Sequence, residues 1–297
     1  MSDKQSEDDN SPTKRAHCAT KWHKMIDKLH QLKRFRLHTG NINNYVELKL
    51  KRFTNSAEEL TECLKLMMNC VPDDTHVNED GTLLLADKKH CENKYERDDL
   101  NITLKLFMET FEFRHLKDAT GAVLKQLDTD VIEQLIIAFP SPDETATKDG
   151  EVDKHWLEQV IRIWKEAETE LVDKGIVTTL GVADFQISEL RKLWDDVRVK
   201  PRIVHVFIEG CCAVPPELQE FARNKNIQLL THNDPRPFPL TNVFRVFCSN
   251  STAESEAKCD ATFCPIWAAR YSVWVRRRSL MAEKGFIVQF VTSAEKM

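Results

Sequence analysis

The sequence predicts an α/β fold in which helices cover a parallel β-sheet. The clearest sign is the stretch 174–235, where short β-rich runs alternate with amphipathic runs in βαβαβ order. The runs 176–182, 203–208 and 227–231 are apolar and rich in β-branched residues, as in buried strands. Between the first two, the apolar residues of 187–197 recur at helical spacing. Strands that alternate with helices form a parallel sheet, because each crossover helix returns the chain to the same end of the sheet.

The middle of the chain continues this alternation. Residues 102–108 and 132–139 have the apolar composition of two further strands. A crossover helix between them is predicted from apolar residues four positions apart, namely Ala119, Val123 and Leu127. A second amphipathic helix follows, and Gly175 can end it because glycine readily adopts the backbone conformation of a helix terminus. The predicted inner face of that helix comprises Trp156, Val160, Trp164, Ala167 and Leu171.

Closer to the N-terminus, Ser56 and Glu59 mark the start of another helix. A serine followed three residues later by a glutamate predicts a capping box, in which the two side chains satisfy free N–H groups of the first turn. The inner face of this helix is predicted to comprise Leu60, Leu64, Met67, Met68 and Val71. Residues 71–81 contain Pro, Asp, Asn and Gly and are predicted to form a loop.

The C-terminal part predicts a pair of strands. Apolar residues alternate with polar ones over 271–275 and over 286–290, with 282–285 between them. A broken helix followed by one strand is the main alternative. The preceding segment, 236–262, contains Pro, Ser and Glu without clear periodicity, and we interpret it as a candidate for a mobile loop.

Length, composition and charge limit the possible classes of function. A chain of 297 residues fits one barrel of the usual ~250 residues or two ordinary domains. The polar, acidic stretch 1–20 is predicted to be a disordered leader, and 21–297 is expected to form a single domain. With a net charge of -5, a pI near 6.1 and no basic stripe with interleaved aromatic residues, nucleic-acid binding is not expected.

A membrane or secreted location is not expected either. The opening residues MSDKQSEDDN lack the apolar stretch of a secretory signal, and no run reaches the ~18 apolar residues that span a bilayer. We therefore expect a cytoplasmic protein. The nine cysteines have no regular spacing and are expected to be free thiols in that reducing compartment. Metal binding is not expected, because neither HExxH nor paired CxxC motifs occur.

Four segments carry a resemblance to a known family. They are LHTGN at 37–41, CCAVPPELQEFA at 211–222, NIQLLTHNDP at 226–235 and ARYSVWV at 269–275. In these segments the chain resembles the regulatory (modifier) subunits of glutamate–cysteine ligase, whose fold is related to the aldo-keto reductase barrel. The resemblance extends over most of the chain beyond about residue 30 and implies a (β/α)8 TIM-type barrel with variant or shortened elements.

The resemblance also implies a partner and a role in glutathione biosynthesis. Such a regulatory subunit forms a heterodimer with the catalytic subunit of glutamate–cysteine ligase, improves its use of glutamate and relieves feedback inhibition by glutathione. No catalytic residue and no required cofactor are then expected, while NADP(H) is retained as a candidate regulatory ligand. The alternative is an NADP-dependent aldo-keto reductase of small carbonyl compounds.

The reductase alternative can be tested against its catalytic residues. That chemistry needs a Tyr as general acid, a Lys that lowers the pKa of the Tyr, a carboxylate that pairs with the Lys, and a His that orients the carbonyl. By resemblance Lys105 matches the lysine, but Ala138 occupies the position of the histidine. Between residues 53 and 100 no Asp-Thr-Ala type turn carries the tyrosine, and Tyr95 lacks that context.

The residues that bind the nicotinamide ring differ as well. By resemblance, Ala183 and Asp184 replace the Ser-Asn pair that holds the nicotinamide amide, and His205 replaces the glutamine of the next strand. Because one lysine without its tyrosine transfers no proton, we do not expect reductase activity.

A vestigial dinucleotide or anion site is the first candidate for a binding function. Its residues are Lys105, Arg276 and Arg277; the run Arg276 to Arg278 stands where the reductases grip the NADP phosphate. The simpler interpretation is that Lys105 is an ion-paired remnant and that the arginines form a solvated strand end.

Adjacent thiols form the second candidate. Cys211 and Cys212 follow a predicted strand and precede a helix, a position that can lower the pKa of a thiol, so redox or partner contact is one interpretation. Cys264 and Cys259 are secondary members of this group. The simpler interpretation is that these are partly buried small apolar side chains.

A polar cluster at a strand end is the third candidate. His232, Asn233 and Asp234 directly follow a predicted strand, where ligands bind in α/β folds. The simpler interpretation is that these side chains satisfy backbone groups of the loop.

Overall fold

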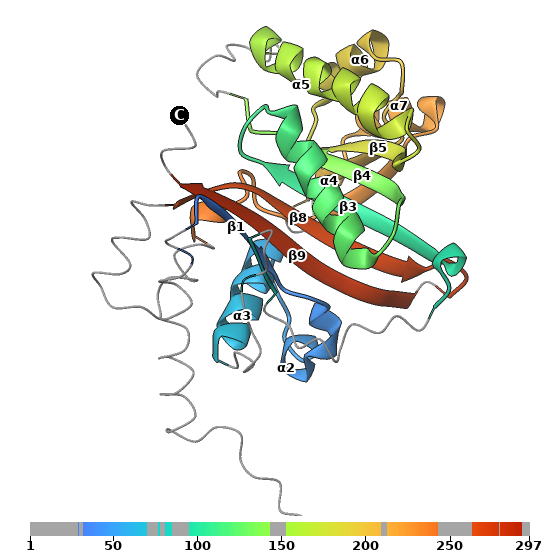
Figure 1. Cartoon of the computed structure of the whole chain (residues 1–297). Coiled ribbons are helices and arrows are strands. Elements are labelled where there is room, and N and C mark those ends of the chain that lie inside the picture. The colour runs from blue at the N-terminus through green and yellow to red at the C-terminus, as the bar shows by residue number, and fades with distance from the viewer. Residues whose placement is uncertain are drawn as a thin grey trace, which may run out of the picture.

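The structure, a computed structural model, describes residues 29, 32–69, 77, 81–84, 95–142, 153–208, 213–242, 263–278 and 280–292. The nine described strands form one mixed sheet in the order β2-β1-β9-β8-β3-β4-β5-β6-β7. Figure 1 shows helices on both sides of this sheet. The predicted α/β class is therefore confirmed. The predicted leader 1–20 and most of the predicted loop 71–81 lie outside the described residues.

The strands are β1 (Arg34–His38), β2 (Thr82–Leu84), β3 (Leu100–Met108), β4 (Ile132–Ala138), β5 (Val177–Ala183), β6 (Ile203–Phe207), β7 (Gln228–His232), β8 (Phe263–Val275) and β9 (Leu280–Thr292). The α-helices are α2 (Val46–Lys49), α3 (Ser56–Asn69), α4 (Phe113–Leu127), α5 (Lys154–Ala167), α6 (Ile187–Asp196) and α7 (Pro216–Lys225). The short 3-10 helices are η1 (Ile42–Asn44) and η3 (Arg97–Asp99), and a π-helical segment, η4 (Glu168–Val172), continues α5. None of the helices in these ranges is long and apolar enough to cross a membrane.

Strands β3 to β7 form the parallel part of the sheet, as the alternating pattern predicts. The helices α4, α5, α6 and α7 connect successive strands, and in Figure 1 they gather on one side of the molecule. Side chains alternate along β3, so Leu104 and Leu106 pack in the core beneath these helices. Lys105 and Phe107 therefore face the opposite side of the sheet, where the candidate site lies.

A long antiparallel ribbon of β8 and β9 lies in the middle of the sheet. β8 pairs with β3 and β9 pairs with β1, both antiparallel. The predicted strand pair is confirmed, and the alternative of a broken helix is wrong. The strands are longer than predicted, because 282–285 lie within β9 and the turn falls at 276–278. The polar residues of that stretch find partners: Glu283 accepts a hydrogen bond from Tyr271 at 3.1 Å.

The sheet is strongly curled. Three strands separate β3 from β7, yet Asp234, just after β7, lies 2.7 Å from Nζ of Lys105 on β3. In a flat sheet β3 and β7 would be roughly 19 Å apart, a gap these two side chains cannot span. The curl agrees with the predicted barrel. In the described ranges, however, β2 and β7 are edge strands, so backbone pairing does not close a ring of strands there.

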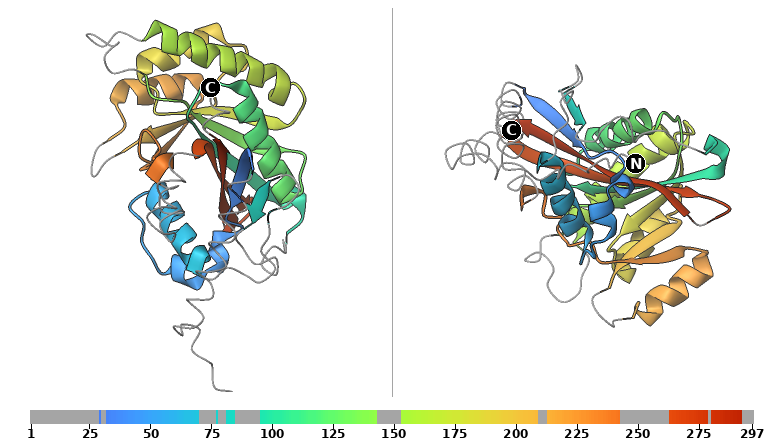
Figure 2. Two further views of the ribbon diagram at one scale, coloured as in Figure 1. Left: turned by 60° about the vertical axis from the view of Figure 1, so that its left-hand side comes forward. Right: turned by 90° about the horizontal axis from the view of Figure 1, so that it is seen from below.

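The two larger apolar cores of the described residues lie on opposite faces of the sheet. The first fills the space under α4, α5 and α6 and includes the fully buried Trp164 and Trp267. The second joins β1, β8 and β9 to α3 and includes Phe35, Phe286 and Phe290. Figure 2 shows α2 and α3 on the side away from α5. Full burial of one such side chain stabilises by about 1.5–3 kcal/mol, so the second core fixes the N-terminal helices to the sheet.

Helix α3 begins at Ser56, but the predicted capping box is wrong by one residue. Oδ1 of Asn55 accepts the N–H of Glu58 at 2.9 Å, and Oε2 of Glu58 accepts the N–H of Thr54 at 2.7 Å. Asparagine is as good a cap as serine, and its longer side chain reaches the first turn from one position earlier. Ser56 is buried instead, and Glu59 forms an ion pair with β9.

The LHTGN segment fastens the end of β1 to β9. Oγ1 of Thr39 accepts the N–H of Phe286 at 2.9 Å, and Nδ2 of Asn41 donates to a carbonyl of β9 at 3.2 Å. Gly40 has a φ of +66°, which suits glycine, and its carbonyl oxygen lies 3.2 Å from the hydroxyl oxygen of Tyr271. Local structure therefore accounts for this motif.

Candidate functional site

The C-terminal ends of the parallel strands enclose a cavity of about 170 Å³. Its apolar walls include Phe107, Phe139 and Phe238. Its charged groups include Asp184 at the end of β5 and the loop residues Asp234 and Arg236 after β7. Because strand ends of one polarity meet here, this is the place where binding sites form in such folds. The resemblance puts the reductase site in the same position.

Lys105 lies beside this cavity and is paired. Its Nζ is 2.7 Å from Oδ2 of Asp234, and both side chains are only 2% exposed. Arg270 on β8 donates to the same carboxylate, with 2.6 Å from Nη1 to Oδ1 and 3.1 Å from Nη2 to Oδ2. The ammonium also lies 5.2 Å from the centre of the Phe107 ring. One buried carboxylate is thus held between two cations.

Burial and charge act in opposite directions on this group. Burial lowers the pKa of Lys105, and the nearby Asp234 offsets only part of that effect. For Asp234, burial alone would raise the pKa, but Arg270 and Lys105 outweigh it and hold the pKa well below its usual range. Asp234 is therefore ionised at neutral pH and fully engaged. The lysine–carboxylate pair that a reductase needs is thus present, but no tyrosine lines the cavity for Lys105 to activate.

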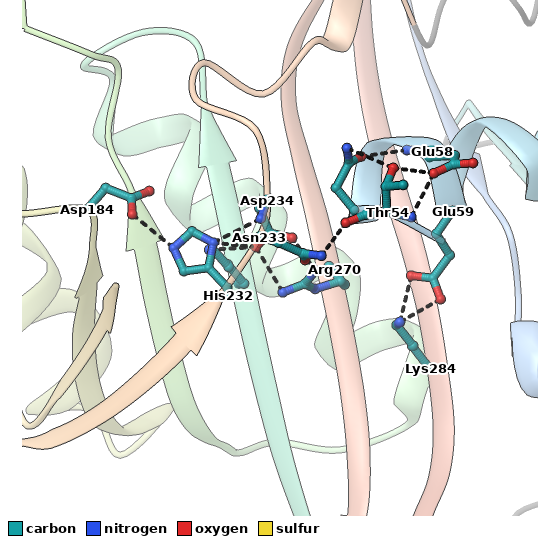
Figure 3. A network of polar contacts seen from close by, with 11 residues as sticks. Thr54, Glu58, Glu59, Asp184, His232, Asn233, Asp234, Arg270 and Lys284 are labelled. Atoms are coloured by element: carbon teal, nitrogen blue, oxygen red, sulfur yellow. Dashed lines mark hydrogen bonds and ion pairs between the residues drawn. The ribbon is translucent and has the colours of Figure 1, made fainter. Parts of the chain in front are cut away.

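The predicted cluster of His232, Asn233 and Asp234 is assembled, and Figure 3 shows its contacts. Nε2 of His232 donates to Oδ1 of Asp184 at 2.9 Å, because Nδ1 accepts the N–H of Asp234 at 3.1 Å. Nδ2 of Asn233 donates to the backbone oxygen of Thr54, just before α3. The three residues thus link the ends of β5 and β7 to the start of α3.

His205 on β6 lies against His232, with 5.5 Å between the ring centres. Burial, followed by repulsion from Lys105, lowers the pKa of His205 to about 3. Its Nδ1 has no hydrogen-bond partner among the described atoms. His205 is therefore a neutral imidazole that adds no positive charge to the site.

The reductase catalytic residues are not assembled at the cavity. Ala138 ends β4 and lines the cavity, so a methyl group stands where the resemblance places the histidine. Tyr95 precedes η3 and the first residue of β3, at the end of the strand opposite the cavity. None of the three tyrosines of the chain lines the cavity. Ala183 and Asp184 do line it. By resemblance these are the two positions whose side chains hold the nicotinamide amide in reductases.

The predicted anion site is not brought together. Arg276 follows β8 at the other end of the sheet, where its Nε donates to the carbonyl of Leu100 at 2.7 Å and its Nη2 lies 3.0 Å from Glu133. Leu100 is five residues from Lys105 along β3, roughly 17 Å. Arg277 is exposed on the turn between β8 and β9. A single phosphate cannot contact both ends of β3.

The cysteine candidates are only partly described. Cys211, Cys212 and Cys259 lie outside the described residues. Cys264 lies on β8 as a half-buried free thiol. In the described ranges no group of three or more His, Cys, Asp or Glu side chains has the arrangement of a metal site.

Two residues of the site are not identified from the sequence. Arg270 stands directly opposite Lys105 in the β3–β8 ladder and completes the charge cluster. A signal existed, because Arg270 is the one charged residue in ARYSVWV, but the sequence does not pair it with Asp234. Arg236, between two prolines, carries no local signal.

Comparison with known proteins gives a family and curated relatives. The model of the Aldo/keto reductase family matches residues 82–233, which is over half of the chain. The human glutamate–cysteine ligase regulatory subunit is 29% identical over 262 residues, covering 85% of this chain and 91% of that protein. A protein named putative glutamate–cysteine ligase regulatory subunit from Schizosaccharomyces pombe is 27% identical, covering 65% and 72%. The predicted resemblance is thereby confirmed.

Reductases match over shorter stretches. Aldo-keto reductase family 1 member C4 of Macaca fuscata fuscata is 26% identical over 167 residues, 52% of this chain and 50% of that one. Among solved structures, the aldose reductase of Schistosoma japonicum is 20% identical with a TM-score of 0.37, covering 59% of this chain and 52% of that one. From the family match, the chain belongs to the aldo/keto reductase family.

Proposed function

We propose that this chain is a regulatory subunit of glutamate–cysteine ligase and has no catalytic activity of its own. The observation that carries the proposal is the match to regulatory subunits over most of their length, 91% of the human protein and 72% of that of Schizosaccharomyces pombe. The reductase matches cover only about half of either chain. A shared fold alone would not decide between the two roles, because functions differ widely on one fold.

The state of the former reductase site supports a role without catalysis. Reductase chemistry requires a mobile proton between a tyrosine and a lysine. Lys105 keeps the ion pair with Asp234 that such chemistry also needs, but no tyrosine lines the cavity, and Ala138 stands where the resemblance places the histidine. Asp234 comes from the loop after β7, so the lysine keeps a carboxylate partner without a neighbouring tyrosine. A domain that lacks these catalytic groups can still serve as a binding partner.

In this role the chain acts through its differential affinity for two states of the catalytic subunit. It binds the catalytic subunit as a heterodimer, improves its use of glutamate and relieves feedback inhibition by glutathione. For a partner to do this, it must bind the active conformation more tightly than the inhibited one. The free thiols expected of nine irregularly spaced cysteines fit the reducing cytoplasm, where we place the complex.

The test is a reconstitution with the catalytic subunit from the same source. Formation of γ-glutamylcysteine is measured against glutamate, with and without glutathione, after gel filtration of the mixture. We expect a complex of the two chains, a lower apparent KM for glutamate and weaker inhibition by glutathione. Unchanged kinetics together with separate elution of the two chains would overturn the proposal.

The reductase alternative is tested separately by incubating the chain with NADPH and small aldehydes. We expect no loss of nicotinamide absorbance. Sustained oxidation of NADPH that disappears in a Lys105→Met variant would establish the alternative.

A further inference from the structure

Two charged residues that line the cavity at the strand ends have hydrogen-bonding atoms that no described residue contacts. Of its charged lining residues, Asp234 is saturated by Lys105 and Arg270, and Glu109 has other contacts. Asp184 and Arg236 remain, one of each sign. Neither residue has a part in the proposed role as a regulatory subunit.

Asp184 is held rigidly in an unusual conformation. Its φ is +61°, a region that costs free energy for a residue with a side chain and that is typical of functional sites. Oδ1 accepts two hydrogen bonds, from the N–H of Phe207 at 3.0 Å and from Nε2 of His232 at 2.9 Å. The described structure gives no hydrogen bond to Oδ2, and in Figure 3 this oxygen points away from His232. The Asp184 side chain is 11% exposed and lines the cavity, so Oδ2 is free to accept a hydrogen bond from a ligand there.

Arg236 supplies the opposite charge beside it. Its Nη1 donates to the backbone oxygen of Asp184 at 2.8 Å, which fixes the guanidinium at the rim of the cavity. The remaining N–H groups of this exposed side chain have no partner in the described part of the chain. Arg236 and the carboxylate of Asp184 are neighbours without forming an ion pair with each other. A carboxylate acceptor and a guanidinium donor are therefore both available at one site.

The walls around these groups are apolar and leave room. Phe107 and Phe238 are stacked at 4.1 Å, and Phe139 closes the side formed by β4. The space exists because Ala138 and Ala183 end their strands with methyl groups. An apolar cavity of about 150 Å³ accommodates benzene, so about 170 Å³ admits a ligand of roughly six to eight non-hydrogen atoms.

We propose that this cavity binds a small α-amino acid as its zwitterion. The ammonium group donates to Oδ2 of Asp184, the carboxylate accepts from Arg236, and the side chain lies against the phenylalanine rings. Opposite charges a few ångströms apart match a zwitterion, whereas a simple anion or cation would satisfy only one of them. The size favours alanine, serine or cysteine over larger amino acids.

This inference does not depend on the proposed function. It uses Asp184 and Arg236, which differ from the groups that the resemblance assigns to carbonyl reduction. It holds for the isolated chain, whether or not the chain binds a catalytic subunit.

The test is a ligand-observed NMR titration of the purified full chain with L-alanine, L-serine and L-cysteine. A ligand of this size binds with a Kd on the order of 1 mM. L-glutamate serves as the oversized probe, and propionate and ethylamine carry one charge each. We expect the three small amino acids to bind at least ten times more tightly than these controls. Equal binding of all probes, or no binding of the three up to 50 times ~1 mM, would overturn the proposal.

Two variants place the ligand in this cavity. Asp184→Asn keeps the acceptor oxygen for Phe207 and His232, and asparagine tolerates the positive φ, but the variant removes the charge. Ala138→Leu fills the space. We expect each to weaken L-alanine binding at least tenfold, while the exposed control Asp195→Asn binds as the parent chain does. Thermal melts verify folding of each variant; if Ala138→Leu is unfolded, Asp184→Asn decides alone. Parent-like binding in folded Asp184→Asn would refute the site.

Discussion

The two ends of β3 carry the same charge arrangement in different surroundings. At one end Asp234 lies between Lys105 and Arg270, with 2.7 and 2.6 Å from the closest nitrogen to an oxygen. At the other end Glu133 lies between Arg97 and Arg276, at 2.9 and 3.0 Å. The distances are nearly equal. In the first cluster Lys105 and Asp234 are 2% exposed and Arg270 20%, whereas in the second Glu133 is 15% exposed and Arg97 and Arg276 are 34% and 50%.

This difference in exposure decides what each cluster does. Around Glu133, water can replace a lost partner, so the cluster adds little to stability. Around Asp234, water is excluded, and removal of one charge leaves the others buried without compensation. The buried cluster also joins β7 to β3 and β8 across the curl of the sheet. Although the distances in the two clusters are nearly equal, their different exposure predicts unequal effects of substitution on stability.

The largest expected effect is that of Asp234→Asn. The amide has the shape of the carboxylate but leaves Lys105 and Arg270 without their counter-charge, so the free energy of unfolding should fall by about 3–5 kcal/mol. Urea unfolding followed by circular dichroism measures this change. A loss below about 1 kcal/mol would show that water reaches the cluster and that burial does not distinguish the two ends.

The next effect is a dependence on pH that comes from His205, beside the buried cluster. Its pKa of about 3 in the folded chain lies below the ordinary 6.5, so the unfolded chain binds the proton first as the pH falls. The contribution of His205 to stability is complete above pH 6.5 and is lost below it, by about 2 kcal/mol between pH 6.5 and pH 5.

His205→Gln should remove this loss. The pKa of buried His38 is also lowered to about 3, and burial lowers the pKa of His115, so we expect the variant to keep more than half of the pH dependence of the parent chain. Unfolding in urea at pH 7.5, 6.5, 5.8 and 5.0 gives the slope. Identical slopes for the variant and the parent would mean that His205 is accessible to protons in the folded state.

The same contrast separates what the sequence could and could not predict. The parallel strands are predictable, because apolar runs such as 102–108 and 132–139 are local signals of burial. The insertion of β8 and β9 between β1 and β3 depends on pairings between distant segments, and no local pattern encodes it. The predicted cap of α3 is wrong by one residue, because asparagine and serine are equally good caps and Asn55 directly precedes Ser56.

Single residues of the candidate site can be predicted from the sequence, but the contacts between them cannot. Lys105 and Asp234 each stood out, one on a strand and one in a polar cluster. That they form a pair depends on the curl of the sheet, which brings together residues 129 positions apart. Arg276 stood out for its charge, but the antiparallel course of β8 carries it to the opposite end of the sheet from Lys105. The residue types therefore indicate candidates for the site, but the sequence does not show at which end of the sheet each of these side chains lies.

A smaller effect is expected for Asn233→Ala, next to the buried cluster. Nδ2 of Asn233 donates to the backbone of Thr54 and links the loop after β7 to the start of α3. The side chain is exposed, so the free energy of unfolding should fall by only about 1 kcal/mol, the usual worth of one hydrogen bond. Urea unfolding of this variant against Asn224→Ala, an exposed asparagine of α7, gives the difference. A loss equal to that of Asp234→Asn would make the link to α3 as important as the ion pairs.

The smallest effect is expected for Glu133→Gln, the counterpart of Asp234→Asn at the other end of β3. Arg97 and Arg276 keep their hydrogen bonds to the carbonyls of Val131 and Leu100, so both guanidinium groups remain solvated and partnered. The free energy of unfolding should fall by no more than about 1 kcal/mol. In 1 M NaCl this loss should vanish, because the screening length shrinks to about 3 Å, whereas the loss in Asp234→Asn should persist because salt does not enter the buried cluster. A loss in Glu133→Gln that is insensitive to salt would place both clusters in the same low-dielectric environment, and the comparison between the two ends would fail.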